Sequence, residues 1–334
     1  MTHEIDRRTV VSLAGGVALA AAMPAQAADD GPSRKLVERP PTMAAILPAT
    51  RYFEIDSARA GARYAIWVTT PTGYDRDSST RYPVIYQPDG NWAAPRTVAD
   101  LAYLPSDAIN PIVPFIQVCV GYAGDDVRNM LAVRARDLLP PGDPMPDGLE
   151  AGLQQEVEQG LYDRAGADLY LHNLRNPAGD KFLAFLTDEL HPLLAQRYRF
   201  KDGDAGLFGY SYGGLFAVYV ALRRSPLFRK IGAGSPGIQA QRSKIFDLYA
   251  DELKAGADHA GRFLHVTVNE REITFPSYYQ PLVGIGSAAF IALASQTPLP
   301  GLAFSSHIIP EESHVSGQSA AWYSFLRTFY SARA

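Results

Sequence analysis

The sequence predicts an α/β protein built on a mostly parallel sheet with helices on both faces. From about residue 80 onward, strand-like stretches alternate with helical ones, which is typical of a parallel sheet. Two of these stretches, PVIYQPDG (83–90) and PFIQVCVGY (114–122), are almost continuously apolar, as strands covered on both faces are. With 47% hydrophobic and 20% charged residues, the chain has the composition of a globular protein.

The first 27 residues are predicted to be a signal peptide of the twin-arginine type. Arg7 and Arg8 precede an apolar run (10–23), and AQA (25–27) then forms an A-x-A cleavage signal. The apolar run is short for a transmembrane helix and ends in a cleavage site, so we expect no stable membrane anchor. A periplasmic or secreted location follows from this prediction.

Residues 51–334 are expected to form one domain, preceded by a leader with little structure (28–50). The first strands, TRYFEID (50–56) and RYAIWVTT (63–70), alternate as half-buried antiparallel strands do. One stretch, at about 123–178, is too long and too rich in proline and glycine for a simple connection. We interpret it as an insertion that caps the site, with a passive excursion as the alternative.

The remaining elements continue the alternation. Residues 179–199 place apolar side chains at helical spacing, and Pro192 should kink or break that helix. The other predicted helices cover about 96–103, 213–223, 239–254, 275–295 and 319–330, and the other predicted strands cover 205–208, 231–235, 262–269 and 303–310.

A G-x-S-x-G motif runs from Gly209 to Gly213, within FGYSYGGLF (208–216). It follows a predicted strand and opens a predicted helix, which is the context this motif needs. Such a turn holds the central residue in strained φ/ψ and requires small neighbours. The amides at the start of the helix favour negative charge developing at the same place. We therefore predict that Ser211 is a nucleophile at the carboxyl end of the sheet.

A serine nucleophile needs a base to take its proton and an acid to orient that base. In this arrangement the chain order is serine, acid, histidine. His314 lies in PEESHVSGQ (310–318), a polar loop between the last predicted strand and the last helix, and we predict that it is the general base. The other histidines after Ser211 are interpreted as packed or surface residues: His259, His265 and His307.

Two glutamates compete for the role of the acid. The predicted strand RFLHVTVN (262–269) runs directly into Glu270 and Glu272. Strand alternation would put both on the same side, so spacing alone leaves both open. Glu311 and Glu312 follow the wrong chain order. For the oxyanion, one donor should be the N–H of Tyr212, and the other should come from the turn YQPDGNW (86–92) after an early strand.

Three stretches of the chain occur in a characteristic combination: YQPDG (86–90), VRARDLLP (133–140) and the helix 179–199 leading into LFGYSYGGLFA (207–217). Together they resemble the esterase family that includes enterochelin and bacillibactin esterases, S-formylglutathione hydrolase and the mycolyltransferases. The resemblance covers roughly residues 50–330. It implies the α/β-hydrolase fold and hydrolysis of a small-molecule ester through an acyl-enzyme, with siderophore-type esters as one substrate class.

The resemblance also implies roles for individual residues. In the siderophore esterases the acid closes a G-x-x-E pattern, and NERE (269–272) occupies that place here, which selects Glu272. Asparagine replaces the glycine, so Glu270 stays an alternative. In relatives the residue after Asp-Gly supplies the second oxyanion amide, and that residue is Asn91. Where many relatives carry Ser-Pro-Ser, this chain has Ser-Pro-Gly (235–237).

The composition argues against several other kinds of function. A net charge of −4 gives no basis for a nucleic-acid partner. The single cysteine, Cys119, lies in an apolar strand-like run and is expected in the core. No H-E-x-x-H pattern is present, and we expect neither a metal nor a cofactor. The alternatives to a hydrolase are an acyltransferase of the mycolyltransferase type and a non-catalytic binding protein.

Five aromatic residues are candidates for lining a pocket at the site, and at least half of them are expected to pack in the core instead: Tyr86, Trp92, Tyr122, Tyr210 and Tyr212.

Overall fold

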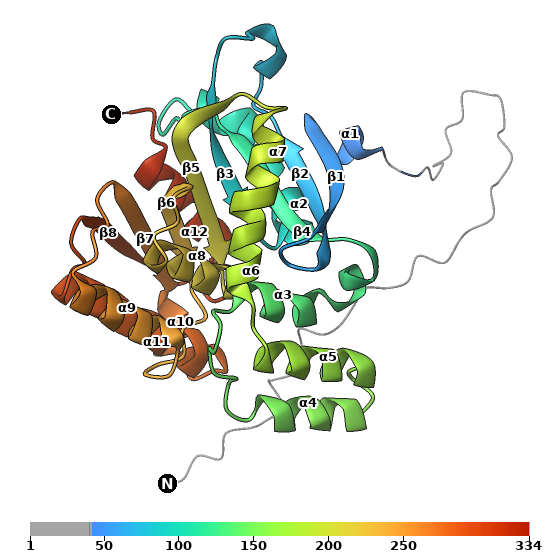
Figure 1. Cartoon of the computed structure of the whole chain (residues 1–334), viewed down its shortest axis with the longest axis vertical. Coiled ribbons are helices and arrows are strands. Elements are labelled where there is room, and N and C mark those ends of the chain that lie inside the picture. The colour runs from blue at the N-terminus through green and yellow to red at the C-terminus, as the bar shows by residue number, and fades with distance from the viewer. Residues whose placement is uncertain (1–39, 41, 334) are drawn as a thin grey trace, which may run out of the picture.

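An eight-stranded sheet forms the centre of the protein. The computed structural model describes residue 40 and residues 42–333, so the predicted signal peptide and most of the predicted leader lie outside the described residues. The strand order is β1-β2-β4-β3-β5-β6-β7-β8 (Figure 1). The strands are β1 (Thr50–Ser57), β2 (Ala62–Thr69), β3 (Tyr82–Gln87), β4 (Ile116–Tyr122), β5 (Phe200–Tyr210), β6 (Phe228–Gly234), β7 (Arg262–Asn269) and β8 (Leu302–Ile309). The pairings β1–β2 and β2–β4 are antiparallel and the other five are parallel, so the predicted mostly parallel sheet is confirmed.

Helices cover both faces of this sheet (Figure 1). They are α1 (Met43–Ile46), α2 (Gly90–Tyr103), α3 (Met130–Leu138), α4 (Leu149–Glu158), α5 (Arg164–Arg175), α6 (Gly179–Ala184), α7 (His191–Ala195), α8 (Tyr212–Leu222), α9 (Lys244–Ala255), α10 (Glu270–Thr274), α11 (Ile285–Gln296) and α12 (Gln318–Phe329). On one face, α3, α6, α8, α9 and α11 contribute to the larger hydrophobic core. On the other face, α2 and α12 contribute to smaller ones.

The strand before the motif separates these cores. Successive side chains of a strand point to opposite faces. Accordingly Leu207 lies in the larger core, whereas Phe208 and Tyr210 lie in the core under α12. The helix that follows, α8, is buried at every position from Gly213 to Leu222, as an all-apolar helix in the middle of a layered protein should be. The motif therefore sits at the centre of the fold.

The predicted interruption of the helix over 179–199 is confirmed. After α6 the chain makes a wider π-helical segment, Phe185–Leu190, before α7. Pro192 has no N–H to donate and crowds the carbonyl four residues before it, and a π turn is one way in which a helix absorbs that defect. Phe182 and Phe185 are buried as the apolar spacing predicts, whereas Leu193 is exposed.

Some predicted boundaries are wrong, for local reasons. Helix α2 begins at Gly90 rather than near residue 96. The sequence did not indicate this early start, because the first residues of the helix, glycine and asparagine, are poor helix formers. Strand β5 begins at Phe200 rather than at residue 205. The sequence did not indicate its first half, because most of the residues there are polar and exposed. The helix expected over 275–295 begins as a π-helical segment, Gln280–Gly284, and continues as α11.

The stretch interpreted as an insertion, 123–178, contains α3, α4 and α5. Val133 and Leu138 of α3 belong to the larger core, so this helix is part of the body of the protein. Helices α4 and α5 lie beyond the sheet, with α5 beside α3 and α4 on the far side of α5 (Figure 1). Asp143 fastens the loop before α4 by accepting hydrogen bonds from Ser243 Oγ at 2.6 Å and Lys244 N–H at 2.8 Å. In the described part of the chain, no helix has both the length and the apolar character needed to span a bilayer.

Candidate active site

Ser211 lies between β5 and α8 with strained backbone angles, φ 60° and ψ −119°. Non-glycine residues adopt such angles only where the surrounding structure imposes them. Gly209 permits the turn, because a β-carbon there would collide with the carbonyl oxygen of Gly213. The turn is also fixed from β6, since Ser211 N–H donates to the carbonyl of Gly234 at 3.0 Å. The serine hydroxyl is thus presented at the carboxyl ends of the parallel strands, on a residue that is partly exposed.

The predicted base and one of the two candidate acids form a buried pair. His314 lies in the loop between β8 and α12, and its Nδ1 is 2.6 Å from Oε1 of Glu272. Glu272 is 1% exposed and His314 is 8% exposed. The second carboxylate oxygen of Glu272 accepts hydrogen bonds from Ser235 Oγ and from the backbone N–H of Asn269, both at 2.8 Å. Both carboxylate oxygens of this buried side chain therefore have hydrogen-bond partners.

The expectation that Glu270 and Glu272 share one side is wrong. Strand β7 ends at Asn269, and Glu270 begins the short helix α10, so the alternation of a strand no longer applies. The helical turn directs the two carboxylates apart. Glu272 meets His314, whereas Glu270 is more exposed and accepts the backbone N–H of Glu311 at 2.7 Å.

The connection between the serine and the imidazole is indirect. Within residues 42–333, Ser211 Oγ makes no hydrogen bond to His314. The residue before the serine supplies the connection, because Tyr210 donates its hydroxyl proton to the backbone carbonyl of His314 at 2.7 Å. The ring of Tyr279 stacks on the imidazole, with centroids 4.1 Å apart and planes 18° from parallel. In hydrolases, the bond between nucleophile and base often forms fully only when substrate is bound.

Both predicted oxyanion amides lie at helix N-termini. Tyr212 is the first residue of α8 and Asn91 is the second residue of α2. The two helices begin side by side, since a β-carbon on Gly213 would lie 3.2 Å from the ring of Pro88 and 3.3 Å from Asp89. The early start of α2 therefore brings the predicted turn next to the motif.

The side chain of Asn91 ties this turn to the next strand. Its amide group accepts the N–H of Tyr122 at 2.8 Å and donates to the carbonyl of the same residue at 3.1 Å. Gly121 allows this contact, because a β-carbon there would collide with Asn91. The position of the Asn91 backbone amide is thus set by the end of β4.

An ion pair that the sequence did not predict braces the same turn. Arg134 of α3 makes two hydrogen bonds to Asp89, at 2.8 and 2.6 Å, and each side chain is only 11% exposed. Its guanidinium lies 5.1 Å from the ring centroid of Tyr212 and 5.6 Å from that of Trp92. Burial alone would lower the pKa of Arg134, but the Asp89 carboxylate outweighs it and holds the pKa above the ordinary value. The only signal in the sequence was that Arg134 is one of three charged residues within VRARDLLP.

Aromatic residues divide between the core and the site. Tyr86, Tyr122 and Tyr210 are buried, so core packing is confirmed for more than half of the five candidates. Trp92 is 38% exposed, and Tyr212 is partly exposed. From the stretch interpreted as a cap, Tyr170 of α5 places its hydroxyl 3.0 Å from that of Tyr212. Helix α5 therefore contacts the residue that follows the predicted nucleophile.

The other histidines after Ser211 occupy structural positions, as predicted. His259 pairs with Glu252 at 3.1 Å, and His265 is held between the hydroxyls of Ser305 and Ser324 at 2.8 and 2.9 Å. His307 is 3.2 Å from the same Ser324 hydroxyl. The core position expected for Cys119 is also confirmed: it is buried in β4, and burial raises the pKa of its thiol to about 12.

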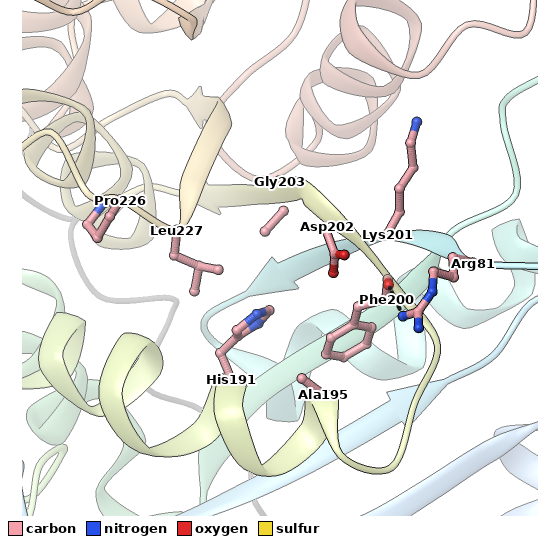
Figure 2. Close-up of a pocket in the computed structure, with 10 residues that line it drawn as sticks. Arg81, His191, Ala195, Phe200, Lys201, Asp202, Gly203, Pro226 and Leu227 are labelled. Carbon is pink, nitrogen blue, oxygen red and sulfur yellow. Dashed lines mark hydrogen bonds between the residues drawn. The ribbon is translucent and has the colours of Figure 1, made fainter.

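A separate cavity of about 210 Å³ lies at the opposite end of the strands (Figure 2). Its lining residues include Arg81, His191, Phe200, Lys201 and Leu227. Phe200 is the first residue of β5 and Tyr210 the last. At 3.3 Å per residue, the part of the cavity lining on β5, from Phe200 to Ala205, is about 20 to 36 Å along the strand from Ser211. It therefore does not belong to the site around Ser211.

A known family matches the part of the chain that carries the motif. The family described as "Putative esterase" matches residues 132–279, which include Ser211 and Glu272. Over this segment the chain is similar to that esterase family. Among its relatives, apo-salmochelin esterase of Escherichia coli O6:H1 (strain CFT073) is 25% identical over 190 residues, which is 57% of this chain. The match spans 51% of that relative, so the chain spans about half the length of the esterase that it matches.

Solved structures of similar proteins establish the fold of this protein. BES protein from Bacillus cereus superposes with a TM-score of 0.67 and 20% identity, covering 89% of this chain and 99% of the other. Siderophore hydrolase EstB from Aspergillus nidulans superposes with a TM-score of 0.67 and 19% identity, covering 88% and 98%. The α/β-hydrolase fold implied by the sequence resemblance is confirmed by these structures.

Proposed function

We propose that this protein is a serine esterase that hydrolyses small-molecule carboxylic esters. The observation that carries the proposal is the strained Ser211 at the turn into α8, near a buried carboxylate–imidazole pair. A strained turn is costly and persists at functional sites. A buried carboxylate on one imidazole nitrogen leaves the other nitrogen to act on the serine.

In the proposed acylation step, Ser211 Oγ attacks the ester carbonyl carbon while Nε2 of His314 takes the serine proton. Glu272, 2.6 Å from Nδ1, holds the tautomer with a proton on Nδ1 and stabilises the imidazolium that forms. The imidazolium then gives its proton to the leaving alcohol, and the acyl group remains on Ser211. Water next attacks the acyl carbon, His314 takes one of its protons, and the acid leaves as the serine is restored.

The negative oxygen of each tetrahedral intermediate needs two donors in fixed positions. The amides of Tyr212 and Asn91, each at the start of a helix, are proposed for this role. The Arg134–Asp89 pair and the Asn91–Tyr122 hydrogen bonds would hold the second amide in place.

Siderophore-type esters are the proposed substrate class. Two of the similar proteins are named for such compounds, apo-salmochelin esterase and siderophore hydrolase EstB. The partly exposed rings of Trp92 and Tyr212 offer contacts for an aromatic substrate. We further propose that residues 1–27 direct export by the twin-arginine route, so that hydrolysis takes place outside the cytoplasm. Replacement of both arginines by lysine should leave the protein in the cytoplasm.

The proposal is tested by assaying residues 28–334 and the Ser211→Ala variant on a panel of esters. The panel contains p-nitrophenyl acetate, butyrate and octanoate, a feruloyl ester and a ferric tri-catecholate trilactone. We expect Ser211→Ala to lower kcat by about 10³-fold or more, and the trilactone to give the highest kcat/KM. A variant as active as the wild type would refute the nucleophile. Transfer to added sugars or alcohols in preference to water would favour the acyltransferase.

A further inference from the structure

We infer that Tyr210, the residue before the proposed nucleophile, is a positioning residue that fixes the proposed base relative to the serine. This inference rests on the proposed function. Tyr210 ends β5 and is 7% exposed. Its ring centroid lies 5.2 Å from that of the His314 imidazole. Because Tyr210 and Ser211 are consecutive, a contact from Tyr210 to the loop of His314 ties the two proposed catalytic residues to one point in the backbone.

The hydrogen bonds of the Tyr210 hydroxyl have one consistent assignment. The hydroxyl lies 2.7 Å from the carbonyl oxygen of His314 and 2.8 Å from Nδ2 of Asn269. A carbonyl oxygen can only accept, so the phenol donates its single proton to His314. The amide nitrogen of Asn269 can only donate, so it donates to the phenol oxygen. The hydroxyl thus joins the strand before the serine, the segment before Glu272 and the loop of His314.

These bonds are part of a closed chain that starts and ends on His314. Nδ2 of Asn269 also donates to Ser235 Oγ at 2.9 Å. Ser235 Oγ donates to Oε2 of Glu272 at 2.8 Å, and Oε1 of Glu272 is 2.6 Å from Nδ1 of His314. One end of the chain therefore holds the backbone of His314 and the other holds its ring. A closed network of buried groups specifies a single arrangement more strongly than separate bonds do.

Tyr279 stacks on the imidazole, whereas the Tyr210 hydroxyl holds the His314 backbone. The preceding residues are tied to α10, because Arg271 contacts the carbonyls of Glu311 and Glu312. The following residue, Val315, is 61% exposed. Among the hydrogen bonds of residues 42–333, the Tyr210 hydroxyl is the side-chain donor to the carbonyl of His314. Since no direct bond connects Ser211 to the imidazole, the Tyr210 contact sets their separation.

The test is Tyr210→Phe, which removes the hydroxyl and keeps the ring. Tyr249→Phe is a matched control, because the buried Tyr249 hydroxyl also donates to a backbone carbonyl, that of Thr297 at 2.7 Å, away from the site. A base displaced by a fraction of an ångström to an ångström slows chemistry more than binding. We expect Tyr210→Phe to lower kcat about 10- to 100-fold with KM within about twofold, and Tyr249→Phe to change neither.

A second measurement separates positioning from loss of folding. Tyr210→Phe loses two buried hydrogen bonds and Tyr249→Phe loses one, so the thermal unfolding midpoint should fall somewhat further in Tyr210→Phe, and kinetics are measured below both midpoints. Incorporation of 4-aminophenylalanine in place of Tyr210 keeps an N–H donor at the same point and should recover most of kcat. If Tyr210→Phe keeps the kcat of Tyr249→Phe while Ser211→Ala is inactive, the positioning role is refuted and the esterase proposal stands. If Ser211→Ala retains full activity, the proposed function itself fails.

Discussion

Removal of the Arg134 guanidinium is predicted to damage stability and activity together. Arg134 and Asp89 share two hydrogen bonds of 2.8 and 2.6 Å, and each side chain is 11% exposed. In Arg134→Met the Asp89 carboxylate stays buried without its partner, which typically costs about 3–5 kcal/mol of the free energy of unfolding. The double variant Arg134→Met, Asp89→Asn should recover about half of that loss or more, because the uncompensated charge is gone.

The same variant should impair catalysis through the turn that carries Asn91. Asp89 holds a left-handed φ of 57° immediately before α2, and Arg134 is its partner. A displaced oxyanion donor costs about 10²–10³-fold in kcat, so Arg134→Met is expected near the lower end of that range. Urea denaturation gives the stability, and ester hydrolysis gives kcat.

A surface pair provides the control for this experiment. Arg63 also makes two hydrogen bonds to an aspartate, Asp56, at 2.8 and 3.0 Å, but these side chains are 53% and 73% exposed. Arg63→Met should therefore leave the urea midpoint and kcat unchanged, because solvent already screens that pair. If Arg134→Met behaved like Arg63→Met, the buried pair would not brace the turn, and the reasoning would be wrong.

Two further predictions concern the acid of the site and the response to pH. Glu272→Gln should lower kcat by about 10³-fold or more, because the imidazole loses the carboxylate that orients it, whereas Glu270→Gln should stay within about twofold. Comparable losses in the two variants would contradict the assignment of Glu272. Burial, and then the charge of His307, lowers the pKa of His265 to about 4. Between pH 6.5 and 4 the His265 side chain is protonated in the unfolded chain but neutral in the folded one. The free energy of unfolding therefore decreases as the pH is lowered through this range, by up to about 3 kcal/mol. Urea denaturation of His265→Gln at several pH values should show no such decrease. If the free energy of unfolding of the variant changed with pH as steeply as that of the wild type, the account would be contradicted.

Local patterns were sufficient to predict the architecture and the position of the motif. Continuous apolar runs mark β3 and β4 because both faces of these strands are covered. The motif could be placed at a strand–turn–helix junction because Gly209 and Gly213 lie between an apolar strand and an apolar helix. His314 stood out for the same kind of reason, as a histidine in a polar loop after the last strand.

Contacts between distant segments were not readable from the sequence. The choice between Glu270 and Glu272 depends on where β7 ends, and helix α10 begins there against the expected alternation. The pair of Asp89 with Arg134 joins residues 45 positions apart, and the bond from Tyr210 to His314 joins residues 104 apart. The residues around a charge or hydroxyl in the sequence do not indicate its partner, because the two groups come together only when the chain folds.

The central claim, that Ser211 is the nucleophile of an ester hydrolase, is tested most directly by covalent labelling. Residues 28–334 would be treated with a fluorophosphonate, and the adduct would be counted by intact mass and located by peptide mapping while hydrolysis of p-nitrophenyl butyrate is followed. We predict one adduct per chain, on Ser211, with activity lost in proportion to labelling and no adduct in Ser211→Ala. An active protein that takes up no adduct, or one labelled elsewhere while Ser211→Ala keeps its activity, would contradict the account.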